Sequence, residues 1–148
     1  MNLLQDYDEF VPIDAVDPLF FEGDPVLKGP IYIAGPMRGM PQFNFPAFFA
    51  AEERLGAKGW ETYNPARADN DFFNADVSKD NLTGSEEMAA EQFGLTIGNA
   101  MARDLTWISN HAKAIYMLKG WEKSSGARAE HALAVALGSV EIFYEATI

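Results

Sequence analysis

Four short β-favouring segments alternate along this chain with longer segments of helical periodicity. The β-favouring segments span residues 31–34, 60–63, 113–118 and 140–144, and the helical segments span 44–57, 85–93, 99–110 and 124–137. Parallel strands joined through helices require right-handed crossovers, and the helices then cover the sheet. The alternation therefore predicts a doubly wound α/β sheet of four to five strands, mostly parallel, with helices on both faces.

The first 29 residues differ in composition from the rest of the chain. Acidic residues, prolines and aromatic residues are mixed there without a lasting period, and Lys28 is the single basic residue. We therefore expect an acidic, Pro-rich N-terminal arm over residues 1–29, which either packs on the body or on another subunit or is partly disordered. Residues 30–148 suffice for one α/β domain and are too few for two ordinary ones.

The composition narrows the chemistry that this chain can perform. The 148 residues include no cysteine and two histidines, which excludes disulfides and thiolate chemistry and argues against a histidine metal centre. A formal charge of −11 disfavours DNA and RNA as partners, although backbone amides and one arginine can still bind a small anion. No apolar run has the length of a membrane span or the flanks of a signal peptide, so we expect a soluble, cytoplasmic protein.

Glu130 occupies an unusual position in the last helical segment. In a helix from Ser124 or Ser125 to Leu137, it falls on the apolar face, between leucines and alanines that recur at helical spacing. Gly138 supplies the stop signal. We expect this carboxylate to be buried beside the sheet; the alternative is a surface glutamate in a different helix register.

The carboxyl ends of the predicted strands gather further polar residues near this helix. In a doubly wound sheet, the loops after the first, second and third strands open on the same edge. We expect that edge to bring together Tyr32, Arg38, Ser124, Ser125, Gly126 and Glu130. Asp104 lies on the helix that leads into the third strand and would face the cleft only if that helix began near the cleft. The polar segment 67–84 is long for a connection and is interpreted as a flap or insertion across the site, anchored by Phe72 and Phe73.

Each of these residues also has an ordinary structural interpretation. Tyr32 in a strand is compatible with core packing, and Asp104 is compatible with a surface pair to Arg103. Ser124 and Ser125 are helix caps first, although capping and anion binding both use the helix N-terminus. Two carboxylates, a phenol and a set of backbone amides are, however, the groups that retaining glycosyl chemistry uses.

Three stretches of the chain together form a more specific pattern. They are Ile31-Tyr32-Ile33-Ala34-Gly35-Pro36-Met37-Arg38-Gly39, Arg103-Asp104-Leu105-Thr106-Trp107-Ile108 and Ser124-x-Gly126-x-x-x-Glu130. In this order they resemble the signatures of the nucleoside 2-deoxyribosyltransferase superfamily. The resemblance covers residues 30–144 and is closest to the branch of nucleoside 5′-monophosphate N-glycosidases and to related, often phage-encoded proteins.

The resemblance implies a flavodoxin- or Rossmann-like domain, usually a homodimer, that acts on a small nucleotide or nucleoside without a metal or organic cofactor. Glu130 would attack C1′, Asp104 would contact the sugar or help to protonate the departing base, and Tyr32 would hydrogen-bond the nucleophile. The positions implied to hold the sugar and the 5′-phosphate are Gly35, Met37, Arg38, Gly39, Ser124, Ser125 and Gly126.

The chain departs from the family pattern at several positions. Ala112 and Lys113 stand where an aspartate commonly precedes the third strand, the turn before Ser124 is longer by two residues, and Arg128 stands where glycine is frequent. These differences bear on the substrate more than on the chemistry. Three functions remain open: hydrolysis of a free (deoxy)nucleoside 5′-monophosphate into base and sugar phosphate, exchange of bases between deoxynucleosides, and nucleotide binding without turnover.

Overall fold

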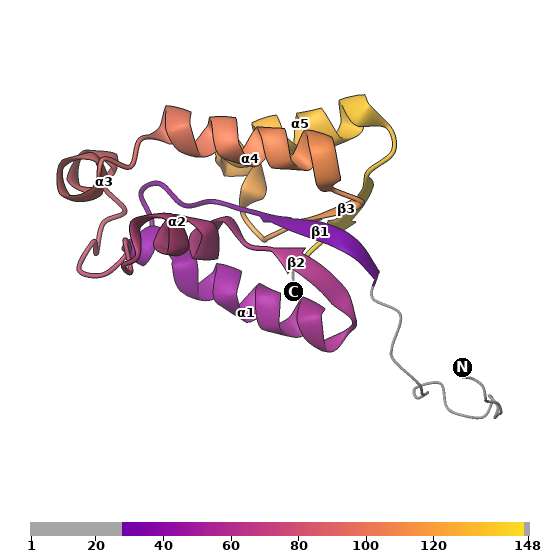
Figure 1. The fold of residues 1–148 in the computed structure, drawn as a ribbon, viewed down its shortest axis with the longest axis horizontal. Coiled ribbons are helices and arrows are strands. Elements are labelled where there is room, and N and C mark those ends of the chain that lie inside the picture. Colours follow the sequence, from indigo (N-terminus) through magenta and orange to yellow (C-terminus); the bar gives the residue numbers. More distant parts are fainter. Residues whose placement is uncertain (1–27, 147–148) are drawn as a thin grey trace, which may run out of the picture.

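The sheet at the centre of the protein contains four parallel strands in the order β2-β1-β3-β4 (Figure 1). The strands span Lys28–Ala34 (β1), Trp60–Tyr63 (β2), Ala114–Met117 (β3) and Glu141–Tyr144 (β4). The computed structural model describes residues 28–146, so the predicted arm lies outside the described residues except for Lys28 and Gly29, which begin β1. The predicted parallel α/β sheet is confirmed.

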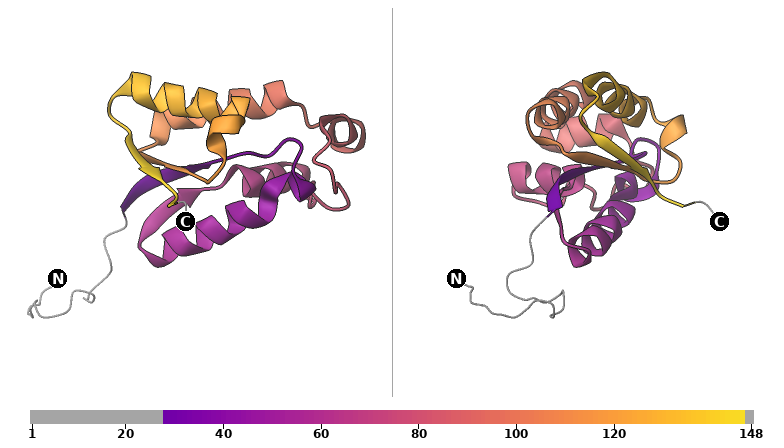
Figure 2. Two further views of the ribbon diagram at one scale, coloured as in Figure 1. Left: turned by 180° about the vertical axis from the view of Figure 1, so that it is seen from behind. Right: turned by 90° about the vertical axis from the view of Figure 1, so that its right-hand side faces the viewer.

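Helices cover both faces of this sheet, as predicted (Figures 1 and 2). On one face lie α1 (Phe45–Ala57) and α2 (Pro65–Phe73), and on the other α4 (Ile97–His111) and α5 (Ser125–Leu137) lie side by side. The short helix α3 (Glu86–Phe93) lies beyond the carboxyl ends of the strands. Two 3-10 turns, η1 (Pro41–Asn44) and η2 (Trp121–Lys123), precede α1 and α5.

Neighbouring residues of β1 pack on opposite faces of the sheet. Ile31 and Ile33 belong to the apolar cluster under α1, whereas Tyr32 and Ala34 belong to the cluster under α4 and α5. Because successive side chains of a strand alternate between faces, the apolar residues on either side of Tyr32 direct its ring towards α4 and α5. This places the phenol on the face that carries Glu130.

The order of the strands creates a crevice between β1 and β3. The chain leaves β1 through α1 to reach β2, and then returns through α4 on the opposite face to β3, on the other side of β1. In doubly wound sheets, ligands bind where the direction of winding reverses, beyond the carboxyl ends of the strands. The fold therefore locates the expected binding crevice between the loops that follow β1 and β3.

The segment 67–84 is more regular than predicted. Its first part belongs to α2, which begins where Asn64 accepts a hydrogen bond from the Ala66 amide (2.9 Å) and Pro65 occupies the first turn. The prediction of a flap or insertion from residue 67 onward is wrong for residues 67–73, because Asn64 and Pro65, which are also compatible with the end of a strand, start a helix here. Phe72 is no anchor, since it is 76% exposed, whereas Phe73 packs against the core.

Residues 74–84 form a compact turn against the loop that follows β1. Asn81 is buried and pairs with the backbone of Ser85 through both of its side-chain polar atoms, at 2.8 and 3.0 Å. The Gly39 amide donates to the Gly84 carbonyl at 3.0 Å, and a side chain at Gly84 would collide with the backbone of the loop. The turn thus holds in place the loop that carries Arg38.

The helices that flank the crevice begin at capping hydroxyls. Ser124 accepts a hydrogen bond from the Ala127 amide (3.1 Å) at the start of α5, and Gly138 ends that helix in a left-handed conformation, both as predicted. Thr96 caps α4 by accepting from the Asn99 amide (3.2 Å), so this helix begins earlier than the predicted start at Asn99.

Candidate active site

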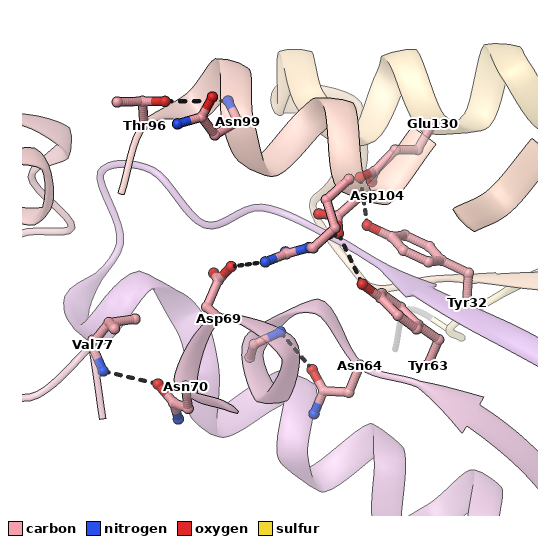
Figure 3. Close-up of polar contacts among 12 residues, drawn as sticks. Tyr32, Tyr63, Asn64, Asp69, Asn70, Val77, Thr96, Asn99, Asp104 and Glu130 are labelled. Atoms are coloured by element: carbon pink, nitrogen blue, oxygen red, sulfur yellow. Dashed lines mark hydrogen bonds and ion pairs between the residues drawn. The ribbon is translucent and has the colours of Figure 1, made fainter. Parts of the chain in front are cut away.

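Glu130 lies on the buried face of α5, against Tyr32 of β1 (Figure 3). The Tyr32 hydroxyl donates to Glu130 Oε2 at 2.6 Å, and the two residues are 0% and 8% exposed. The predicted burial of Glu130 on an apolar helix face is confirmed, since Ala127 and Ala134 on the same face are buried as well. Burial raises the pKa of Glu130 to about 8, and the hydrogen bond from Tyr32 opposes this rise.

Asp104 contributes a second buried carboxyl from α4 and is 6% exposed. Its Oδ1 accepts hydrogen bonds from Arg103 Nε (2.8 Å) and from the Tyr63 hydroxyl (3.4 Å). Asp104 was expected to face the cleft only if its helix began near the cleft. α4 meets this condition, because its first residue, Ile97, lines the cleft, and the cleft extends between α4 and α5 as far as Asp104 and Tyr32. Burial raises the pKa of Asp104, and Arg103 opposes the rise.

Three stacked aromatic rings form the apolar floor behind these carboxyls. Tyr63 stacks on Trp107 with ring centroids 4.4 Å apart and on Tyr32 with centroids 5.5 Å apart. Burial raises the pKa of Tyr63 to about 12 and that of Tyr32 well above its ordinary value. Both phenols therefore remain protonated near neutral pH and act as hydrogen-bond donors to the carboxyls.

Arg103 and Asp69 extend the site towards α2. Arg103 NH1 lies 2.7 Å from Asp69 Oδ1 and forms a close ion pair with it. The N–H group of Arg103 is not aligned with Oδ1 for a hydrogen bond, so Oδ1 accepts none from the described residues. Burial raises the pKa of Asp69 to about 6, and Arg103 opposes the rise. The guanidinium of Arg103 thus acts on three carboxyls, those of Asp69, Asp104 and Glu130. One positive charge among three acids favours a state in which some of the carboxyls are protonated, and the titration of each depends on the others.

The start of α5 and Arg38 form the polar end of the cleft. The guanidinium of Arg38 donates to the Ser125 hydroxyl through NH2, and its NH1 lies 2.8 Å from a carboxylate oxygen of Glu86. The first amides of a helix have no partner inside the helix and carry a partial positive charge. One arginine and the start of a helix are the groups expected to hold a phosphate.

The open cleft encloses about 460 Å³. It is lined by Tyr32, Gly35, Met37, Arg38, Phe48, Pro65, Ile97, Ala100, Met101, Asp104, Ser124, Gly126, Ala127 and Glu130. A mostly apolar slot of about 410 Å³ adjoins it and shares Met37, Arg38, Ile97 and Ala100 with it. Both volumes include space open to solvent, and the cleft and the slot together present one polar and one mostly apolar end to a small ligand.

Two predicted site residues lie outside the lining of the cleft. Gly39 shapes the loop after β1 at a φ of 78°, and Ser125 contacts Arg38 from the start of α5. Arg128, whose role was left open, donates to the Glu122 carbonyl at 3.1 Å and is exposed. It therefore stabilises the turn before α5 and does not line the cleft.

Gly35 lines the cleft and also has a packing function. A Cβ at Gly35 would lie 2.8 Å from Leu118 Cβ, so any side chain would force β1 and the segment after β3 apart. Gly126 is different, since a Cβ there would meet only Met101 Sδ at 3.7 Å and Ser124 Oγ at 4.0 Å. The start of α5 consequently leaves room for a ligand beside Gly126.

Tyr63, Arg103 and Asp69 were not predicted as site residues. Tyr63 ends β2 at the carboxyl edge of the sheet, which is a signal that could have identified it. Arg103 precedes Asp104, but neighbouring residues of a helix normally point in different directions. Asp69 had no signal, because the helix that carries it was not predicted.

Neither a metal cluster nor a membrane-spanning helix is found in the part of the chain that the structure describes. Within residues 28–146, no group of three or more histidines, aspartates and glutamates is arranged to hold a metal ion. The helices of the same residues are too short or too polar to cross a bilayer.

The fold and the cleft define a doubly wound α/β protein with a buried tyrosine–glutamate pair and a second buried carboxyl at its binding crevice. A family model described as "Domain of unknown function (DUF4406)" matches residues 30–144. The chain belongs to this family. No curated protein and no solved structure matches the chain.

Proposed function

We propose that this protein hydrolyses the N-glycosidic bond of a free nucleoside or deoxynucleoside 5′-monophosphate through a glycosyl–Glu130 intermediate. The observation that carries the proposal is the buried hydrogen bond of 2.6 Å from Tyr32 to Glu130, beside a second buried carboxyl in an open cleft. The resemblance of three sequence stretches to nucleoside 2-deoxyribosyltransferases supports the same reaction. A retaining glycosyl hydrolase requires one carboxylate as nucleophile and a second group as acid and base.

In the first step, an oxygen of the ionised Glu130 forms a bond to C1′ while the bond from C1′ to the base nitrogen breaks. The base leaves with the electron pair of that bond and takes a proton from Asp104. Tyr32 donates to Oε2 and so leaves Oε1 for the attack. The product of this step is a glycosyl ester of Glu130 and a free base.

In the second step, water attacks C1′ and the ester bond to Glu130 breaks. The proton of the water returns to Asp104, and Glu130 recovers its charge. The net reaction consumes one water and yields the base and the sugar 5′-phosphate. Asp104 thus acts first as an acid and then as a base, which suits a carboxyl whose pKa burial has raised.

The two ends of a nucleotide match the two ends of the binding space. Arg38 and the start of α5 offer charge-assisted contacts to a phosphate. The adjoining slot, lined by Met37, Ile97 and Ala100 among others, offers apolar walls to a base. Glu130 and Asp104 line the cleft but not the slot, and Arg38 lines both, so the sugar would bind in the cleft beside the two carboxyls.

A panel of ribonucleoside and deoxyribonucleoside 5′-monophosphates, assayed for release of free base, tests the proposal. Release of base together with sugar 5′-phosphate is the expected result. Addition of a second free base distinguishes hydrolysis from exchange, because exchange would produce a new nucleoside or nucleotide. Absence of base release from every nucleotide, with nucleotide binding retained, would support a non-catalytic nucleotide-binding protein instead.

Replacement of Tyr32 by phenylalanine should lower kcat/KM at pH 7 by about 10- to 100-fold, through loss of a charge-assisted hydrogen bond. The Tyr32 hydroxyl lowers the pKa of Glu130, so its removal should shift the ionisation of Glu130 above the wild-type value of about 8. The rising limb of a plot of kcat/KM against pH measures this shift. A wild-type profile for the variant would contradict the role of Tyr32. Tyr116→Phe, which removes a phenol next to the other apolar cluster, is the matched control.

Replacement of Arg38 by methionine should raise KM for a nucleoside monophosphate by about 10- to 100-fold while kcat changes little. The physical reason is loss of the charged donor that faces the start of α5. The same variant should act on the corresponding nucleoside with unchanged KM, because a nucleoside carries no phosphate. An equal rise in KM for both substrates would indicate that Arg38 contacts the sugar or the base and not the phosphate. Arg54→Met removes an arginine that pairs with Glu145 outside the cleft lining and serves as control.

A further inference from the structure

We infer that Asp69 and Arg103 form a positioning pair for Asp104, in which Asp69 holds the Arg103 guanidinium against the Asp104 carboxyl. The inference rests on the proposed function, because Asp104 is there the group that exchanges a proton with the departing base. Arg103 lines neither the cleft nor the slot, whereas Asp69 is one of the residues that line the slot. Both act on the reaction through Asp104.

The first observation is the unusual direction of the Arg103 side chain. Arg103 and Asp104 are consecutive residues of α4, and consecutive side chains of a helix do not normally face each other. Arg103 Nε nevertheless lies 2.8 Å from Asp104 Oδ1. The arginine side chain therefore bends towards Asp104 and is only 28% exposed.

Asp69 supplies the contact that keeps Arg103 in this position. It projects from α2, on the segment between β2 and α4, and its Oδ1 lies 2.7 Å from Arg103 NH1 (Figure 3). The planar guanidinium thus spans two carboxyls, with Nε at one and NH1 at the other. A single contact would leave the arginine free to rotate away from the cleft, whereas two contacts on different helices fix its plane.

Stability alone does not explain this arrangement. Asp69 is 4% exposed, and Arg103 NH2 is buried without a hydrogen-bond partner among residues 28–146. A buried ion pair with unsatisfied polar atoms is weak support for a fold, since desolvation offsets much of the attraction. The arrangement is more readily understood from its effect on Asp104.

Arg103 is the one cation among the ionisable groups that act on Asp104 in the described part of the chain. From the other elements packed around it, Asp104 is faced by Tyr32 of β1, Tyr63 of β2, Asp69 of α2 and Glu130 of α5. The phenols can stabilise a carboxylate by hydrogen bonds, but the other two groups are acids. Only Arg103 can offset the negative charge that Asp104 acquires when it gives its proton to the base.

Three variants test the pair by two readouts, a 13C NMR titration of the Asp104 carboxyl and steady-state kinetics. Arg103→Gln is expected to raise the titration midpoint of Asp104 by about one pH unit or more. Asp69→Ala also removes a neighbouring negative charge, which lowers the midpoint, so it is compared with Asp69→Asn and should have the higher midpoint of the two. In the assay of base release, Asp69→Ala and Arg103→Gln should each lower kcat by about 10-fold with KM within threefold. Asp69→Asn should restore most of the loss, because its amide oxygen can stay beside Arg103 NH1. Asp69→Ala and Asp69→Asn remove the same charge, so their difference isolates the positioning effect.

The test includes a matched control variant and a stated outcome that would overturn the inference. Glu52→Gln weakens another ion pair of α2, in which Arg67 contacts Glu52 at 2.7 and 2.8 Å. It should change thermal stability without moving the Asp104 midpoint. An unchanged midpoint in folded Arg103→Gln, or equal midpoints in Asp69→Ala and Asp69→Asn, overturns the inference. If Asp69→Ala does not fold, Arg103→Gln and Asp69→Asn decide it.

A failure of the proposed function gives a different experimental result from a failure of this inference. If wild-type protein releases no base from any nucleotide, the reaction assigned to the cleft is wrong. The NMR titration uses protein without substrate and still decides whether Asp69 and Arg103 control Asp104. A shifted midpoint with an unchanged kcat would show that the pair acts on Asp104 but that Asp104 is not the acid, and would overturn the positioning role.

Discussion

Glutamine in place of Glu130 is expected to abolish base release, with kcat reduced by about a thousandfold or more. An amide cannot form the glycosyl ester, and α5 carries no other carboxylate that could replace Glu130. Glutamine has nearly the shape of glutamate, and its side-chain oxygen can still accept from Tyr32, so nucleotide binding should persist. Initial rates of base release and isothermal calorimetry with a poor substrate measure the two effects separately.

The covalent intermediate gives this prediction a direct physical check. Wild-type protein quenched in acid during turnover should carry the added mass of one sugar phosphate, and Glu130→Gln should carry none. Glu141→Gln, which replaces an exposed glutamate of β4, should behave as wild type. Base release by Glu130→Gln at the wild-type rate would contradict the glycosyl–glutamate mechanism. Tight nucleotide binding without turnover by either protein would favour a nucleotide sensor.

The folded protein is expected to lose stability as the pH rises from about 4.5 to about 8, and Glu130 should be a main cause. The pKa of Glu130 is raised from 4.5 to about 8 in the folded state, so between these values the folded state binds more protons than the unfolded state. The free energy of unfolding then falls with increasing pH. The full difference for one group with this shift is up to about 5 kcal/mol, an upper bound because coupled carboxyls share protons.

Glu130→Gln isolates this contribution. The variant should be more stable than wild type at pH 8 by several kcal/mol at most, and the difference should vanish well below pH 4.5, where wild-type Glu130 is protonated in both states. Urea unfolding followed by circular dichroism at a series of pH values measures the free energy of unfolding of both proteins. Parallel curves for the two proteins would show that Glu130 ionises normally. Asp69, whose pKa is raised to about 6, contributes in the same direction and is unchanged in both proteins.

These two expectations have a common physical origin. Burial of Glu130 against Tyr32 and the alanines of α5 lowers the stability of the charged form that the proposed reaction uses. A carboxylate with little hydration is also a stronger nucleophile and proton acceptor. Loss of activity together with a gain in stability at pH 8 is therefore the signature expected of a buried catalytic glutamate.

Local patterns in the sequence determined the parts of the fold that depend on residues close together in the chain. The strand at 60–63, the caps Ser124 and Gly138, and the burial of Glu130 follow from periodicity and from capping within one or two turns. The alternation of strands and helices predicted the doubly wound class for a similar reason, since each crossover involves neighbouring elements. The missed α2 is an exception, because Asn64 and Pro65 are compatible with both a strand end and a helix start.

Only the tertiary structure decided which side chains surround the two carboxyls. The depth of the cleft depends on how α4 packs beside α5, and this places Asp104 near Tyr63 although its helix begins well before it. The contact between Asp69 and Arg103 joins residues from α2 and α4. Periodicity reports which face of an element is buried, but it carries no information on the distance between two faces that different helices present to each other. The charge state of Glu130 and Asp104 depends on those distances and on burial, and so it was determined by packing and not by the pattern of residues.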